Sequence, residues 1–246
     1  MEGDIAPVGG RTTGSEPATA GRPAPAESPL LEPPLVDVAV QRRIAPQQQS
    51  AEDEVRRLLS VALRLMVDGG SNRPPRVADI VQAAGLSNDA FYRSFRSKDD
   101  LVAAVVDDGA RRLVSYVRHR MEREADPVAQ IRSGIEAVMK QAADPTVAAA
   151  TRAVFHNASR LAGPGTTDRV QLTWWIAGLF EAPMSALGSP DPVRDARTAA
   201  LASLAAMRHF IWAEDAPIGE DMDHLVAFVL RAIRADRVGG ETSAVR

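Results

Sequence analysis

The residues between positions 76 and 98 combine hydrogen-bonding and basic side chains with the spacing of two short helices. Apolar residues recur at helical intervals over 77–84, Gly85 interrupts them, and Ser87 can cap a further helix that runs to about Phe95. A glycine in the turn permits a positive φ, and two short helices joined in this way have helix-turn-helix geometry. We therefore expect the second helix to enter the major groove of double-stranded DNA.

This second helix is expected to have two different faces. Phe91 and Phe95 are spaced i and i+4, which predicts that both pack inward. The opposite face and the flanking helix ends carry the residues expected to contact DNA, which are Arg76, Ser87, Asn88, Asp89, Tyr92, Arg93, Arg96 and Lys98. Over 71–98, five basic and two acidic residues leave a local net charge of +3, against −3 for the whole chain. A basic face on an acidic protein favours modest phosphate binding per subunit, which two copies would strengthen.

The run DIVQAAGLSNDAFYRSFRSKDDL, residues 79–101, resembles the N-terminal signature of the tetracycline-repressor family of one-component regulators. The likeness covers residues 51–101, and beyond them only the helical layout and the length agree. The resemblance implies that Tyr92 and Lys98 contact phosphates while the recognition helix contacts bases. The chain departs from the family at Arg76, where threonine is frequent, and at Asp89, where glycine, proline or threonine is frequent. Phosphates would repel Asp89 unless its carboxylate accepts from a cytosine amino group.

The elements that must position this segment are predicted to be helices throughout, about nine in all, which makes the fold class all-α. Asp-Pro pairs at 126–127, 144–145 and 191–192 each start a helix, because the aspartate caps it and the proline suits its first position. Pro183 is expected to kink or end the helix that contains it. The predicted helices span 51–69, 77–84, 87–95, 97–124, 127–143, 145–161, 167–187, 192–212 and 221–237.

The domain organisation follows from composition. Residues 1–50 hold eight of the 17 prolines and no aromatic residue, so they are predicted to be a disordered tail. A helix-turn-helix domain is expected over 51–97, an effector-binding and dimerisation domain over 98–237, and a second disordered tail over 238–246.

Composition also excludes several classes of function. The chain has no cysteine, which removes thiol nucleophiles, disulfides and cysteine-ligated metals. Its four histidines lack the i, i+4 spacing of a helical metal site, and no nucleophile elbow or phosphate-binding glycine loop is present. We therefore expect no enzyme activity, no cofactor and no metal. No apolar run is long enough to span a bilayer and no signal peptide is evident, so a cytoplasmic protein without a membrane partner is expected.

Two sets of residues are assigned to the C-terminal region. Large side chains around Pro183 fit either an effector pocket between helices or an ordinary helical core, and they are Phe155, Trp174, Trp175, Phe180, Met184 and Met207. Apolar residues on the last two helices are expected to form a two-fold dimer interface, and they are Leu204, Ile211, Leu225, Val226, Val229, Leu230 and Ile233.

The function that these features favour is a ligand-responsive, DNA-binding transcriptional regulator. We expect a homodimeric repressor that binds an inverted-repeat operator and is released by a small, largely apolar effector. Two alternatives stay open. The first is a dimeric regulator without a small-molecule effector, whose C-terminal domain is a protein-interaction platform. The second is an all-α protein that does not bind DNA.

Overall fold

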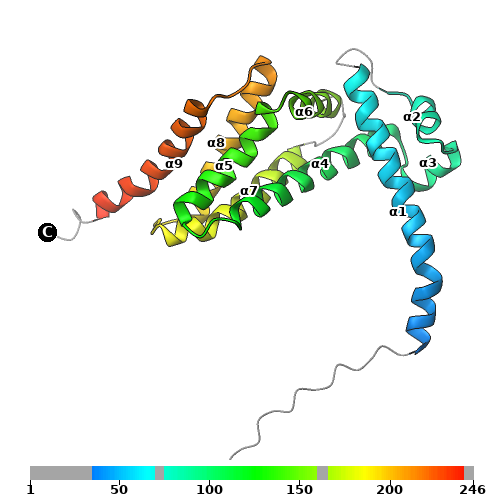
Figure 1. The fold of residues 1–246 in the computed structure, drawn as a ribbon, viewed down its shortest axis with the longest axis horizontal. Coiled ribbons are helices and arrows are strands. Elements are labelled where there is room, and N and C mark those ends of the chain that lie inside the picture. Colours follow the sequence, from blue (N-terminus) through cyan, green and yellow to red (C-terminus); the bar gives the residue numbers. More distant parts are fainter. Residues whose placement is uncertain (1–34, 70–74, 160–165, 241–246) are drawn as a thin grey trace, which may run out of the picture. The chain divides into compact units, whose positions relative to one another are not determined.

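The computed structural model describes residues 35–69, 75–159 and 166–240. Over these residues the chain forms nine α-helices and no strand, which confirms the predicted all-α class (Figure 1). None of the helices in these ranges is long and apolar enough to cross a membrane. The helices are α1 (Leu35–Gly69), α2 (Val77–Ala84), α3 (Asn88–Ser94), α4 (Lys98–Met121), α5 (Pro127–Ala143), α6 (Pro145–Ala158), α7 (Thr166–Ala186), α8 (Pro192–Ala213) and α9 (Gly219–Gly240).

The N-terminal end of α1 corrects one prediction. The helix begins at Leu35, whereas the sequence placed its start at Ala51 and left residues 1–50 without structure. Seven of the eight prolines in that stretch, and all of its glycines, precede Leu35, so averaging over 50 residues concealed a change in composition. Residues 35–50 contain only Pro46 as a helix breaker, and the helix continues through it. Residues 1–34 and 241–246, the remainder of the predicted tails, lie outside the described residues.

The chain divides into two compact units, residues 1–46 and 47–246. Within the second unit, the predicted Asp-Pro helix starts are confirmed. The Asp126 carboxylate accepts from the Ala129 amide at 2.9 Å, Asp144 accepts from Thr146 and Val147 at 3.0 and 3.2 Å, and Asp191 accepts from Arg194 at 3.1 Å. Each cap satisfies amides that the helix leaves without a partner.

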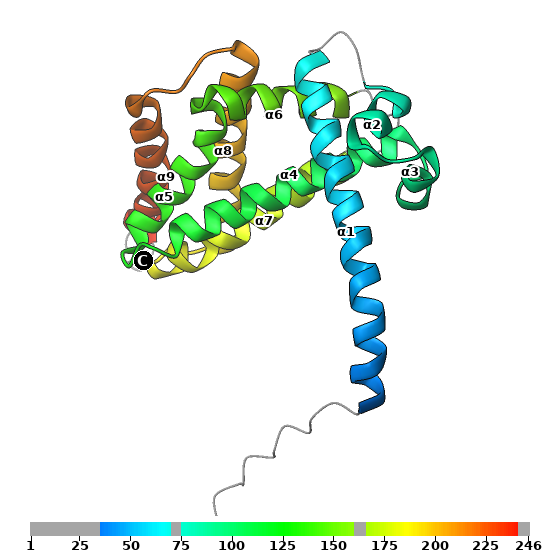
Figure 2. The same cartoon turned by 45° about the vertical axis from the view of Figure 1, so that its right-hand side comes forward.

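Buried side chains of residues 47–246 gather into two cores. The first core consists of Leu58, Val61, Ala62, Met66, Ile80, Val81, Ala84, Phe91, Phe95, Leu101, Val102, Val105 and Ala153. The second core consists of the buried side chains of α5, α7, α8 and α9, with those of α4 from Leu113 onward. In both views α5 lies beside α8 and α9 (Figures 1 and 2). Helix α4 supplies residues to both cores. The first core extends along α4 as far as Val105, which lies beyond the predicted domain boundary at residue 97.

Pro183 lies inside α7, which continues for one further turn before it ends at Ala186. The proline is buried, and its neighbour Met184 belongs to the second core. The helix therefore ends after the proline, close to the predicted limit of residue 187.

Candidate nucleic-acid interface

The turn between α2 and α3 depends on a single glycine. Gly85 adopts φ 64° and ψ 34°, the left-handed conformation. Its amide donates to the Gln82 carbonyl at 3.1 Å, and the Leu86 amide donates to the Val81 carbonyl at 2.9 Å. This pair of bonds is a Schellman motif, which ends α2 and turns the chain sharply. No neighbouring atom would meet a Cβ at position 85, so the conformation rather than the available space selects glycine there.

Helix α3 is short and is oriented by its buried side. The Ser87 hydroxyl caps it by accepting from the Ala90 amide at 3.1 Å. Phe91 is fully buried in the first core, and its ring lies 5.8 Å from that of Phe95 and 5.2 Å from that of Tyr92. Tyr92 itself is 59% exposed. Two adjacent aromatic residues therefore have opposite environments, one in the core and one on the surface.

The structure gathers the predicted DNA-contacting residues around this exposed side of α3. Lys98 is half-buried at the first position of α4, and the other seven are exposed, namely Arg76, Ser87, Asn88, Asp89, Tyr92, Arg93 and Arg96. Asp89 lies in the first turn of α3, where a carboxylate is favoured by the helix dipole. This interaction with the helix dipole accounts for the presence of an acidic residue among the basic side chains of this face.

The start of α4 is held by a reciprocal set of hydrogen bonds. The Ser97 hydroxyl accepts from the Asp100 amide at 3.1 Å, while the Asp100 carboxylate accepts from the Arg96 amide at 3.0 Å. These bonds resemble a capping box. They fix the backbone on both sides of Lys98, next to the end of α3.

One contact at this face was not anticipated from the sequence. The Arg93 guanidinium lies 3.4 Å from the Glu54 carboxylate, which joins α3 to α1 across 39 residues of sequence. Helical spacing on either element gives no sign of such a pair, because neither residue lies within four positions of the other.

Residues that are close together on α6 contact different cores. Ala153 is buried in the first core, and Phe155 packs against the second. Arg152 donates from Nε to the Ile211 carbonyl at 3.0 Å and pairs with Glu214 at 3.2 Å. These contacts hold the C-terminal end of α8, where Glu214 adopts a positive φ of 56°.

Five of the six residues proposed to line an effector pocket lie in the second core or pack against it. Phe180, Met184 and Met207 are buried in the second core, and Phe155 and Trp175 pack against it. Trp174 is half exposed, and the Arg197 guanidinium lies 5.5 Å from its ring centroid. The Arg111 guanidinium likewise lies 5.2 Å from the ring centroid of Trp175. A hydrogen bond from Arg111 to Asp107 raises the pKa of the guanidinium above its ordinary value.

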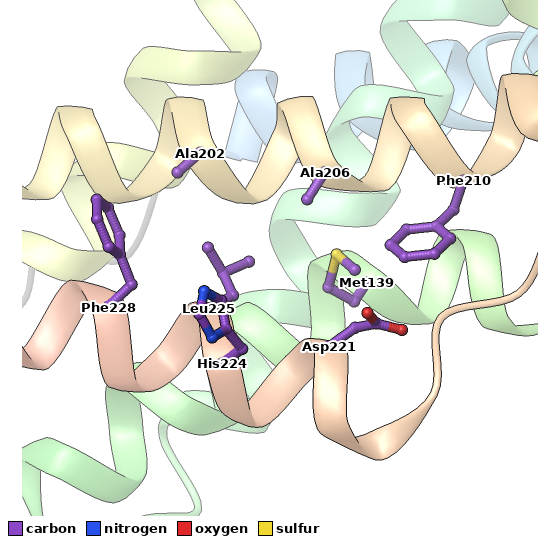
Figure 3. Close-up of a pocket in the computed structure, with 8 residues that line it drawn as sticks. All are labelled: Met139, Ala202, Ala206, Phe210, Asp221, His224, Leu225 and Phe228. Carbon is purple, nitrogen blue, oxygen red and sulfur yellow. The ribbon is translucent and has the colours of Figure 1, made fainter.

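A cavity does exist elsewhere in the described part of the chain. It is an open groove of about 360 Å³ between α8 and α9, called the α8–α9 groove below. Figure 3 shows Leu225 and Phe228 of α9 extending toward Ala202 and Ala206 of α8. The remaining lining residues are Met139, Phe210, Asp221 and His224.

The residues proposed for a dimer interface lie in or against the second core. Leu204, Ile211, Val226, Val229 and Ile233 are buried in the second core of a single chain, and Leu225 and Leu230 pack against that core. The apolar stripe of α9 packs against α5 and α8 of the same chain, so three helices meet where the sequence suggested a free face. Arg132 of α5 also pairs with Asp223 of α9, and this hydrogen bond raises the pKa of Arg132. Large apolar side chains that α8 and α9 leave exposed are Val193, Leu201, Trp212 and Phe228.

Among the described residues there is no group of three or more histidine, aspartate or glutamate side chains that could hold a metal ion. The arrangement therefore offers hydrogen-bonding and cationic side chains on a short exposed helix. Such a helix is narrow enough to enter the major groove, where base edges are distinguishable.

Comparisons with known proteins agree with this geometry. Residues 58–105 match the family model described as bacterial regulatory proteins, tetR family. That range includes α2, α3 and the α4 residues that complete the first core. No curated protein is significantly similar to the chain.

Solved structures show the same fold over most of the chain. A TetR-family transcriptional regulator from Streptomyces coelicolor is 21% identical with a TM-score of 0.58, covering 76% of this chain and 95% of that one. The fatty acid degradation regulator FadR from Bacillus halodurans is 16% identical with a TM-score of 0.53, covering 72% and 96%. RolR in complex with resorcinol is 14% identical with a TM-score of 0.52, covering 76% and 90%.

Proposed function

We propose that this chain is a dimeric repressor of the tetR family of bacterial regulatory proteins, because residues 58–105 match that family's model and form a helix-turn-helix. It binds an inverted-repeat operator and is released by a small, largely apolar effector. The observation that carries the proposal is the division of α3, which buries Phe91 and exposes Tyr92, Arg93 and Asn88. A helix anchored on one side and polar on the other is what major-groove recognition requires.

The exposed residues divide into two roles. Tyr92 and Lys98 contact phosphates, which hold the protein in register without reading sequence. Asn88 and Arg93 reach base edges, where a well-placed bidentate contact contributes about 1–3 kcal/mol of discrimination. Arg76 and Arg96 add positive charge that attracts the phosphates on either side of the DNA major groove.

The dimer forms through the exposed side of α8 and α9. Phe228 lines the α8–α9 groove, Leu201 and Trp212 are exposed on α8, and a second copy related by a two-fold axis would cover all three. Covering them removes large apolar side chains from water, which stabilises the association. The same symmetry sets two α3 helices on successive major grooves, about 34 Å apart.

Release by an effector acts through the helices that belong to both cores. Helix α4 begins with Lys98 at the DNA face and ends among second-core residues, and α6 contacts the first core, the second core and the end of α8. A ligand that prefers a different placement of these helices lowers operator affinity by its differential binding to the two states. Two proteins of this fold support a small ligand, since one is a complex with resorcinol and another is named as a regulator of fatty acid degradation.

One observation favours a second candidate, a dimeric regulator without a small-molecule effector. Phe180, Met184 and Met207 fill the second core, so a ligand among them would have to displace packed side chains. Thermal unfolding of the protein with a panel of small aromatic and acyl compounds separates the candidates. A ligand that raises Tm and also weakens operator binding supports the effector, because binding only to the folded chain stabilises it.

The test of DNA binding uses a duplex from the region upstream of the protein's own gene. Retardation of this fragment, and a footprint with two inverted half-sites, are expected. A protein that retards it no better than a duplex of scrambled sequence would contradict operator binding.

A further inference from the structure

We propose that Glu54 of α1 is a positioning residue for Arg93, and that it raises the specificity of DNA binding. The inference rests on the proposed function, in which Arg93 reads a base edge. Glu54 would hold the Arg93 guanidinium in place for that contact and would hinder its use as a general phosphate contact.

The three acidic residues at this level of α1 have different partners. Glu52 and Asp53 both pair with Arg56, within the same helix, at 3.7 and 2.7 Å. Glu54 pairs with Arg93, at 3.4 Å, on the recognition helix. The Glu54 side chain is half-buried, since its exposed fraction is 33%, whereas that of Glu52 is 64%. Of these three acids, Glu54 is therefore the one whose charge bears directly on the predicted DNA face.

The position of Arg93 makes this pair consequential. Arg93 follows Phe91 by two residues on a helix that Phe91 anchors in the first core, so its backbone is firmly placed. Its side chain is long and 66% exposed, and without a partner it would sample many rotamers. The pair to Glu54 engages Nη2 and leaves the other donors of the guanidinium for DNA.

Phosphate contacts and base contacts respond differently to such a partner. A phosphate attracts any nearby positive charge, so a carboxylate 3.4 Å from Arg93 weakens that attraction. A guanine edge requires a guanidinium with a defined orientation, and holding the side chain in advance lowers the entropy cost of that contact. Glu54 therefore disfavours sequence-independent binding more than operator binding.

The experiment compares Glu54→Gln with Glu52→Gln, which removes the same charge from the same turn of α1 but acts on Arg56. Each is made in the full chain, with and without Arg93→Gln. Affinity is measured at several salt concentrations for two probes. One is a 30-base-pair duplex of random sequence, and the other is the duplex that wild type enriches most strongly from a randomised library.

We expect Glu54→Gln to tighten binding to the random duplex by about tenfold per dimer, and to tighten binding to the enriched duplex less. The salt slope on the random duplex should steepen by about 0.9 per subunit, because Arg93 gains a phosphate. In the Arg93→Gln background, Glu54→Gln should act no more strongly than Glu52→Gln. Both variants should keep the melting temperature of wild type, since the pair is largely solvated.

Three outcomes would overturn the role of Glu54. They are an equal effect of Glu52→Gln, an unchanged effect of Glu54→Gln when Arg93 is absent, and equal tightening on both duplexes. A wild-type protein that enriches no sequence and binds neither probe would instead contradict the proposed function itself.

Discussion

The first core and the second core differ in how far a residue's role can be read from its neighbours in sequence. In the first, α3 packs through Phe91 and Phe95 and exposes its other side, so helical spacing alone separates inward from outward residues. In the second, α5 contacts α8 and α9 and is buried on more than one face, and α8 and α9 also contact each other. On a helix with a single neighbour, an apolar stripe therefore indicates the side that packs against that neighbour. On a helix with several neighbours, the stripe alone does not indicate which of them it contacts.

The largest effect is expected from the adjacent aromatic residues of α3. Phe91→Ala should lower the free energy of unfolding by about 3–5 kcal/mol, because it leaves a cavity in the first core. Tyr92→Phe should leave stability near that of wild type and weaken binding to all DNA sequences. Thermal unfolding and gel retardation measure the two effects. A destabilised Tyr92→Phe protein would show that the face of α3 is assigned incorrectly.

The second prediction contrasts neighbouring residues of α9. Val229→Glu places a carboxylate in the second core and should cost several kcal/mol of folding free energy, whether or not the chain dimerises. Phe228, which is 53% exposed, lines the groove instead. Phe228→Glu should keep the helical content and yield a monomer that no longer binds the operator tightly.

Sedimentation and circular dichroism distinguish these results. Arg231→Glu, on an exposed position of the same helix, serves as the charge control. If Phe228→Glu sediments as wild type does, the interface lies on another surface.

The third prediction compares three glycines. A Cβ at Gly134 would meet the Phe180 ring, which is fully buried, and would lie 2.9 Å from Met121 Sδ, so Gly134→Ala should cost about 1–3 kcal/mol. Gly85→Ala meets no atom but forces alanine into the left-handed region, at about 1–2 kcal/mol. Gly109→Ala, in the open middle of α4, should stabilise by about 0.5–1 kcal/mol.

Denaturant unfolding of the three variants tests whether space or backbone conformation selects each glycine. Gly134→Ala as stable as wild type would mean that the second core is less closely packed than the contacts of Phe180 indicate.

The smallest effect concerns Lys98. Lys98→Ala should weaken binding to every sequence to a similar extent and reduce the salt slope by about one per subunit, because one phosphate contact is lost. Folding should be unaffected. A changed base preference, measured by selection from a randomised library, would assign Lys98 to base reading instead.

Much of the fold follows from local chemistry. Asp126, Asp144 and Asp191 each precede a proline, and all three cap a helix as their sequence context predicts. Gly85 takes the positive φ that its place between two helical patterns requires. The start of α1 could not be placed in this way, because Leu35 follows a proline-rich stretch whose composition dominated the longer window.

The sequence by itself determined the helices apart from the start of α1, the aspartate caps, the turn at Gly85 and the two faces of α3, because these depend on residues within about four positions of one another. Tertiary structure alone decided that Val226, Val229 and Ile233 face the chain's own core, that Phe228 stays exposed, and that Arg93 meets Glu54. Periodicity reports which side of a helix is apolar, but it carries no information on how many other helices that side meets. The number and placement of those neighbours depend on packing between segments distant in sequence, and only the folded chain specifies them.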